Sequence, residues 1–123
     1  MKIFSLIVLL VASTTVTATD VVSVTIGAGG PNVDACPSFA ELNKLTIVHK
    51  GPSTGFSEVT RLKPGTQLHV CGHTKNGLWT SVVLALDGVT DCKVSSPVAQ
   101  PHFYRGPCTS GWVLTKNVRI IAG

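Results

Sequence analysis

Short apolar segments rich in β-branched residues recur along the chain, and residues that favour turns separate them. Between residues 56 and 62 apolar Val59 and Leu62 flank polar positions, and we interpret this segment as a strand. Pro64-Gly65 fits a type II turn, and Asn76-Gly77 is a strong hairpin signal. The pattern predicts strands over residues 21–26, 45–49, 56–62, 67–71, 78–86, 112–114 and 118–121. Six or seven short strands are typical of a small all-β barrel or sandwich.

Helical character is confined to residues 38–45, after Cys36-Pro37. Ser38 stands three residues before Glu41, as in a capping box. The segment is short, so it fits two helical turns, one turn or none.

The N-terminus has the pattern of a secretory signal peptide. A positive Met1-Lys2 pair precedes ten apolar residues, 3–12, and Val16-Thr17-Ala18 offers a cleavage site. We expect residues 1–18 to be removed and the mature chain to begin at Thr19. The alternative is a retained membrane anchor, although ten apolar residues are short for spanning a bilayer.

The charge of the chain is mildly basic. Ten basic and six acidic residues give a net charge of +4, or about +3 after Lys2 is removed with the signal peptide. Such a charge favours adsorption to anionic polymers such as cell-wall glycans or lipid headgroups. Because the chain has no run of Lys or Arg, it does not indicate a nucleic-acid partner.

Four cysteines in an exported chain predict two disulfides. Three connectivities are possible. We favour Cys92–Cys108, because this bond ties together the ends of one loop rich in Pro and Ser, and Cys36–Cys71 then follows by elimination. Closing a loop of about fifteen residues stabilises a small domain by roughly 3 kcal/mol in the chain-entropy model.

The longest irregular segment, residues 87–110, combines two cysteines, three prolines and a pair of aromatic residues. Phe103 and Tyr104 are adjacent there, between His102 and Arg105. Aromatic rings with a flanking Arg suit the binding of sugars or carboxylate-bearing peptides. Pro101 and Pro107 bracket the segment, and the alternative interpretation, a cover over one end of a barrel, fits the aromatic residues somewhat better.

Catalytic and metal-binding patterns are weak. His69, Cys71 and His73 would share one face of a strand that continued to residue 73, and imidazole and thiolate are ligands of Zn and Cu. Positions i, i+2 and i+4 spread over about 13 Å on a straight strand, however, and a disulfide would consume Cys71. The six acidic residues are scattered, and the chain has no G-x-S-x-G elbow. We therefore expect no enzyme activity, cofactor or metal.

Several pieces of the chain, in their order and spacing, resemble the bacterial SH3b family of SH3-like barrels. They are "VHKGPSTGF", "VTRLKPGTQLHV", "NGLWTSVVLA", "SGWV" and "VRIIAG", over residues 45–123. "PNVDACPSF", "CKVSSPV", "YRGPCTSGWV" and the terminal "IAG" resemble small exported single-domain proteobacterial members and extend the likeness back to Gly30. The family's "LRSGPG" turn reads His49-Lys50-Gly51-Pro52-Ser53 here, without the Arg-Ser pair and the second Gly.

After the signal peptide (1–18), the resemblance implies an N-terminal extension with the first strand (19–44) and an SH3b-like barrel (45–123), which contains the long loop that the cysteines are expected to staple. It also implies a stand-alone, non-catalytic binding module in the periplasm or outside the cell, because family members bind peptidoglycan or its cross-bridge peptides. We expect a cell-envelope ligand such as a peptidoglycan peptide; the alternative is a module that binds or inhibits an envelope protein. The expected binding residues are Phe56, Trp79, Phe103, Tyr104 and Arg105, with Trp112 as a structural floor.

Overall fold

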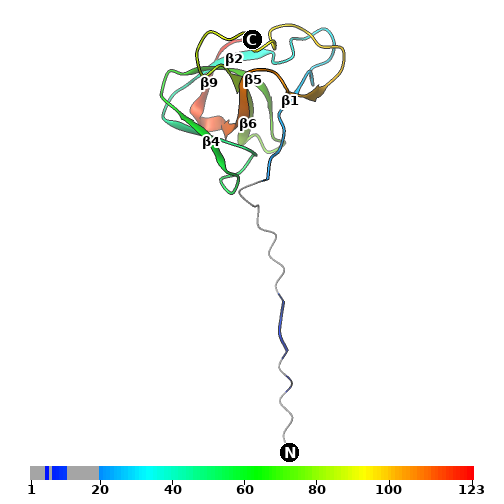
Figure 1. The fold of residues 1–123 in the computed structure, drawn as a ribbon, viewed down its shortest axis with the longest axis vertical. Coiled ribbons are helices and arrows are strands. Elements are labelled where there is room, and N and C mark those ends of the chain that lie inside the picture. The colour runs from blue at the N-terminus through cyan, green and yellow to red at the C-terminus, as the bar shows by residue number, and fades with distance from the viewer. Residues whose placement is uncertain (1–4, 6, 11–19) are drawn as a thin grey trace, which may run out of the picture.

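The fold was analysed in a computed structural model, which describes residue 5, residues 7–10 and residues 20–123. The predicted signal peptide, 1–18, and its cleavage site lie largely outside the described residues. From residue 20 onward the described chain forms short strands and one 3-10 turn (Figure 1). These elements are β1 (Thr25–Ile26), β2 (Ser38–Leu42), β3 (Thr46–His49), β4 (Glu58–Leu62), β5 (Gln67–His73), β6 (Trp79–Leu84), β7 (His102–Phe103), β8 (Thr109–Leu114), η1 (Thr115–Asn117) and β9 (Val118–Ala122).

Seven strands form one antiparallel sheet in the order β4-β3-β8-β6-β5-β2-β9. β1 and β7 form a separate two-stranded ribbon. The large sheet curves around its inner face (Figure 1). β4 and β9 are the two edge strands in its hydrogen-bonded order. The all-β prediction is therefore confirmed. No helix in the described part of the chain is long and apolar enough to cross a membrane.

The sheet is covered on both faces, and each face has its own core. The inner core takes residues from six strands: Ala40, Leu42, Val48, Leu62, Leu68, Val70, Val82, Leu84 and Val113. The outer core joins the sheet to the N-terminal segment and the long loop through Val24, Ile26, Ala35, Cys36, Cys71, Val83, Cys92 and Val94. All six residues of β6 are buried as a result, including the polar Thr80 and Ser81.

The segment with helical character is a strand. In β2, Ala40 and Leu42 are buried in the inner core, whereas Phe39 and Glu41 between them are only half-buried. This period of two fits a strand, and β2 is paired on both sides, with β5 and with β9. Pairing within the sheet thus overrides the weak capping-box signal.

Other boundaries differ from the sequence-based expectation. The first strand is reduced to Thr25–Ile26, and the predicted strand at 112–114 begins earlier, at Thr109. The segment 27–30 is a turn in which Gly27 and Gly30 have φ angles of +81° and +97° and the N–H of Gly30 donates to the Gly27 carbonyl at 3.2 Å. Glycine suits both positions because other residues rarely adopt positive φ.

Gly111 lets two strands approach closely. A Cβ atom at this position would lie 2.5 Å from Cγ1 of Val48 and 2.7 Å from the backbone oxygen of His49. The His49 oxygen belongs to the backbone, so it cannot move aside by changing a side-chain rotamer to make room for a Cβ atom. The glycine of the Gly-Trp-Val sequence is therefore required by the contact between β8 and β3.

Candidate functional site

The ribbon of β1 and β7 holds the aromatic segment against the N-terminal part of the chain. Thr25 pairs with Phe103 and Ile26 pairs with His102. The N–H of Tyr104 extends the pairing by donating to the Val24 carbonyl at 2.8 Å. The sequence does not predict β7, because two residues are too few to show a period.

Both disulfides hold this region, and their pairing is the one favoured from the sequence. Cys36 is bonded to Cys71 of β5, and Cys92 is bonded to Cys108. The N–H of Cys36 also donates to the Val94 carbonyl at 3.0 Å, so the N-terminal segment is hydrogen-bonded to the long loop. The ribbon is thus fixed to the sheet from both sides.

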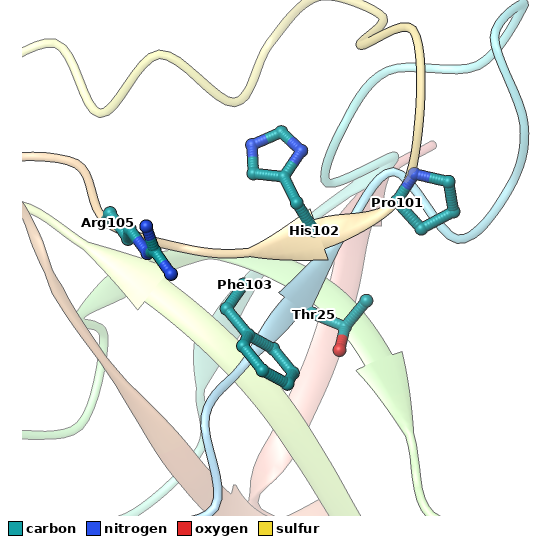
Figure 2. A pocket seen from close by; sticks show the side chains of 5 residues that line it. All are labelled: Thr25, Pro101, His102, Phe103 and Arg105. Carbon is teal, nitrogen blue, oxygen red and sulfur yellow. The ribbon is translucent and has the colours of Figure 1, made fainter.

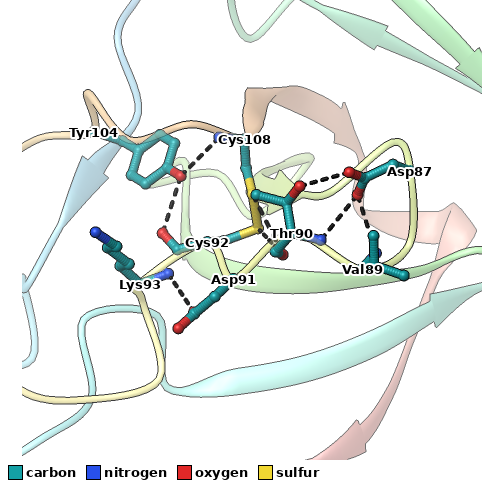
Figure 3. Close-up of a disulfide and its surroundings, with 8 residues drawn as sticks. All are labelled: Asp87, Val89, Thr90, Asp91, Cys92, Lys93, Tyr104 and Cys108. Carbon is teal, nitrogen blue, oxygen red and sulfur yellow. Dashed lines mark hydrogen bonds between the residues drawn. A yellow bond between two sulfur atoms is a disulfide. The ribbon is translucent and has the colours of Figure 1, made fainter.

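Tyr104 belongs to the support of the loop. Its hydroxyl donates to the Cys92 carbonyl at 3.0 Å and accepts the N–H of Cys108 at 3.1 Å (Figure 3). The ring is half-buried and packs against the outer core. One side chain therefore bridges the two half-cystines of the staple.

Phe103 points away from this support. Figure 2 shows its ring beside Thr25, on the opposite side of the ribbon from His102. The ring is 55% exposed and lines a shallow pocket of about 420 Å³. The residues that line the pocket are Thr25, Pro101, His102, Phe103 and Arg105.

Arg105 supplies a cation to the same pocket. Its side chain is exposed, and the ion pairs found among the described residues, Arg61–Glu58 and Arg119–Glu41, do not involve it. A guanidinium beside an exposed aromatic ring can pair with a carboxylate while the ring contacts an apolar group of the same ligand. His102 lies at the edge of the pocket with its Nδ1 2.9 Å from the Gln100 carbonyl.

Phe56 and Trp79 lie elsewhere, and neither lines the Phe103 pocket. Trp79 is only 8% exposed and meets His49 edge-on, with ring centroids 5.6 Å apart. The Nδ1–H of His49 in turn donates to the Phe56 carbonyl at 2.8 Å. These contacts hold the 50–57 turn against the sheet.

Trp112 lies outside the lining of the Phe103 pocket. Its indole N–H donates to the Val22 carbonyl at 2.8 Å, and the half-buried ring packs against the outer core. The residue therefore ties the N-terminal segment to β8.

His69, Cys71 and His73 do not share a face, and this expectation was wrong. The register of β5 against β6 shifts between Val70 and Gly72. His69 consequently pairs with Val83 of the outer core, whereas His73 pairs with Thr80, two residues from Val82 of the inner core. A bulge changes the side to which the following residues point.

The three residues also have other partners. Cys71 is in a disulfide, and Nδ1 of His73 lies 3.0 Å from the Thr80 hydroxyl. Partial burial lowers the pKa of His69, against a smaller opposing effect of the Asp91 carboxylate, so its neutral form is favoured. Among the described residues no group of three His, Cys, Asp or Glu side chains is placed to hold a metal ion.

Asp87 is committed to a turn. Its carboxylate accepts the N–H groups of Val89 and Thr90 at 3.0 and 2.9 Å and the Thr90 hydroxyl (Figure 3). These bonds, led by the one from the Thr90 hydroxyl, lower the pKa of Asp87 to about 2. The carboxylate is therefore ionised and already hydrogen-bonded, which does not suit a general acid.

Of the five expected binding residues, the structure brings Phe103 and Arg105 into one pocket, whereas Tyr104 does not line that pocket and is hydrogen-bonded to the loop staple. The sequence did not indicate the contributions of Thr25 and Pro101. The only available signals were the β-branched run that contains Thr25 and the proline before the aromatic pair. Comparison with known proteins adds no relative: no family model, curated protein or solved structure matches the chain.

Proposed function

We propose that this protein is an exported, non-catalytic binding module with an SH3-like fold, and that it binds a cell-envelope component such as a peptidoglycan peptide. The observation that carries the proposal is the pairing of an exposed Phe103 ring with the Arg105 guanidinium in one pocket. The ribbon that presents them is fixed by the Cys92–Cys108 bond and by Tyr104. Such fixing reduces the entropy that a loop loses on binding.

The SH3-like assignment is supported by the arrangement of the C-terminal strands. The Gly-Trp-Val sequence lies in β8, the short turn after it is η1, and the final strand is β9. This is the order in which the SH3b resemblance places them. Short antiparallel strands curved around a single inner core also suit a small barrel.

Export and a non-catalytic role are supported by the cysteines. Two disulfides are consistent with an oxidising environment such as the periplasm or the cell exterior. Because all four cysteines are oxidised, Cys71 is not available as a nucleophile beside the neighbouring histidines.

A peptide ligand with a carboxylate fits the pocket by its chemistry. The guanidinium can form two parallel hydrogen bonds with a carboxylate, and the exposed ring offers an apolar surface to a small aliphatic side chain. Stem peptides of peptidoglycan present both groups. The shallow form of the pocket suits an extended peptide better than an enclosed small molecule.

The test is retention on insoluble peptidoglycan. We expect the wild-type protein to sediment with it and Phe103→Ser/Arg105→Gln to be retained about tenfold less, because a central aromatic residue and an Arg commonly dominate binding energy. Val59→Ser/Arg61→Gln is the matched control: it removes an exposed apolar side chain and an Arg from β4. Retention of the control should equal that of the wild type.

Two results would overturn the proposal. Equal retention of wild type and Phe103→Ser/Arg105→Gln would exclude the pocket, and no retention of the wild type would exclude the ligand. In the second case, capture of an envelope protein by wild type but not by the double variant would favour the alternative function, a protein-binding or inhibitory module acting through the same ribbon.

A further inference from the structure

A different end of the molecule combines exposed leucines with lysines. The 43–45 turn and the β5–β6 hairpin both contact η1 there. The Asn43 amide donates to the Lys116 carbonyl at 3.1 Å, and the N–H of Asn43 donates to the Asn117 carbonyl at 3.0 Å. From the other side, the N–H of Thr115 donates to the Leu78 carbonyl at 2.9 Å. Hydrogen bonds therefore hold these three chain segments next to one another.

We name this surface the lysine end, and it consists of Lys44, Leu45, Lys75, Leu78 and Lys116. All five side chains are exposed, and both leucines are 60% exposed. Leu78 and Leu114 line one shallow pocket together with Lys116. The apolar surface of the hairpin thus continues to η1, next to a cation.

The hairpin that carries Leu78 is held rigidly. The Asn76 side chain accepts the Thr74 hydroxyl at 2.6 Å and the N–H of Leu78 at 3.0 Å. Gly77 has a φ of +72°, a backbone conformation that residues other than glycine rarely adopt. Leu78 is therefore presented in a fixed position, and its exposure does not depend on a mobile loop.

The ion pairs found among the described residues, Arg61–Glu58 and Arg119–Glu41, involve none of the three lysines. Glu41, the acidic residue closest in sequence to Lys44, is paired with Arg119. Asp87 and Asp91 follow the other end of β6, a strand whose six residues span roughly 20 Å. We name the segment with Asp87 and Asp91, which follows β6 at the end opposite the Lys75–Leu78 hairpin, the anionic end; Lys93 follows Asp91 there.

The anionic end provides an internal comparison. Leu86 is also 60% exposed and Val89 is 85% exposed, but Asp87 and Asp91 accompany them. The two ends thus expose similar aliphatic side chains with opposite charge. Exposed aliphatic groups alone do not distinguish the lysine end; their combination with three lysines does.

We infer that the lysine end docks on the surface of an anionic phospholipid bilayer. Lysines near such a surface are attracted by its negative potential, and leucines among them enter the boundary between headgroups and acyl chains. Lysine stems can lie along apolar surface while the ammonium groups stay at the phosphates. A protein partner fits less well, because lysine is depleted in protein–protein interfaces.

The test is co-sedimentation with vesicles, using protein recovered from the exporting cell with its N-terminus read by mass spectrometry. We expect binding to phosphatidylcholine vesicles that contain about 30% phosphatidylglycerol, and little binding to pure phosphatidylcholine. Lys44→Gln/Lys75→Gln/Lys116→Gln should weaken binding by about tenfold or more. Leu45→Ser/Leu78→Ser should weaken it by about tenfold, through loss of apolar insertion.

The matched control is Leu86→Ser/Val89→Ser, which removes aliphatic groups that are at least as exposed from the anionic end and should bind like the wild type. Every variant carries the same N-terminus, so differences among them report on the substituted surface alone. Failure of the wild type to bind anionic vesicles would overturn the inference. An equal loss of binding in the Leu86→Ser/Val89→Ser control would also overturn it. Unchanged binding of Leu45→Ser/Leu78→Ser would overturn it as well, because binding would then be electrostatic adsorption without insertion of the leucines.

A measurement without substitutions at the lysine end keeps the inference testable if those variants fold poorly. Trp79 lines the same pocket as Leu78. In Trp112→Phe protein the remaining indole is Trp79, and lipids brominated on the acyl chain should quench its fluorescence when anionic vesicles are added. Vesicle binding without this quenching would show that another surface makes the contact.

Discussion

At the scale of the residue, neighbours in the sequence take different roles because a strand alternates its sides. Phe103 and Tyr104 are adjacent, yet one ring is 55% exposed and the other is half-buried against the outer core. The Tyr104 hydroxyl joins the backbone at both half-cystines of the staple. Tyr104 therefore supports the pocket, and Phe103 with Arg105 forms it.

This division predicts the effect of Tyr104→Phe. The ring would remain, but the Cys92 carbonyl and the Cys108 N–H would lose their partner. We expect the free energy of unfolding to fall by about 1–2 kcal/mol, measured by urea denaturation. The exposed Phe103→Leu should change it by less than about 0.5 kcal/mol. An unchanged stability of Tyr104→Phe would contradict the supporting role.

At the scale of the element, the 87–90 turn shows how a local hydrogen-bonded group responds to pH. The ionised Asp87 carboxylate accepts both N–H groups of the turn and the Thr90 hydroxyl. Because the pKa of Asp87 is lowered in the folded state, to about 2 from 3.8, the folded turn favours the ionised form. The stabilisation is complete above the ordinary pKa of 3.8 and is lost as the pH falls through about 2.

An acid titration followed by NMR tests this turn. The Asp87 carboxyl should titrate with a midpoint near 2, and the amide signals of Val89 and Thr90 should move with the same midpoint. In Asp87→Asn these low-pH changes of the two amides should disappear, because the amide side chain does not titrate. A midpoint at 3.8 in the wild type would contradict the hydrogen bonding described here.

At the scale of the whole molecule, two layers with different supports are joined. The sheet has its own inner core, whereas the ribbon and long loop depend on the outer core and on the disulfides. Cys36–Cys71 is buried and reaches into the sheet, and Cys92–Cys108 closes a loop outside it. The two bonds should therefore differ in what their loss disturbs.

Removing the loop staple predicts a local effect. Cys92→Ser/Cys108→Ser should lower the free energy of unfolding by about 3 kcal/mol, from the loop that the bond closes. Hydrogen exchange should accelerate more in β1 and β7 than in β5, β6 and β8, because the bond holds the loop and ribbon directly. Cys36→Ser/Cys71→Ser is the comparison, and it should accelerate exchange in β5 as well. If hydrogen exchange accelerated equally in β6 and β7 of Cys92→Ser/Cys108→Ser, the sheet and the ribbon would unfold together, and the local effect would be contradicted.

The sequence by itself determined the all-β class and the turns at Pro64-Gly65 and Asn76-Gly77, and among three possible disulfide pairings it favoured the one that the structure has. Each of these follows from local periodicity, from turn chemistry or from the loop that a bond would close. Only the tertiary structure decided the rest. Pairing on both sides made residues 38–42 a strand, and a bulge separated His69 from His73. The two-residue β7 and the meeting of three turns at the lysine end leave no periodic signal, because contacts between distant segments create them.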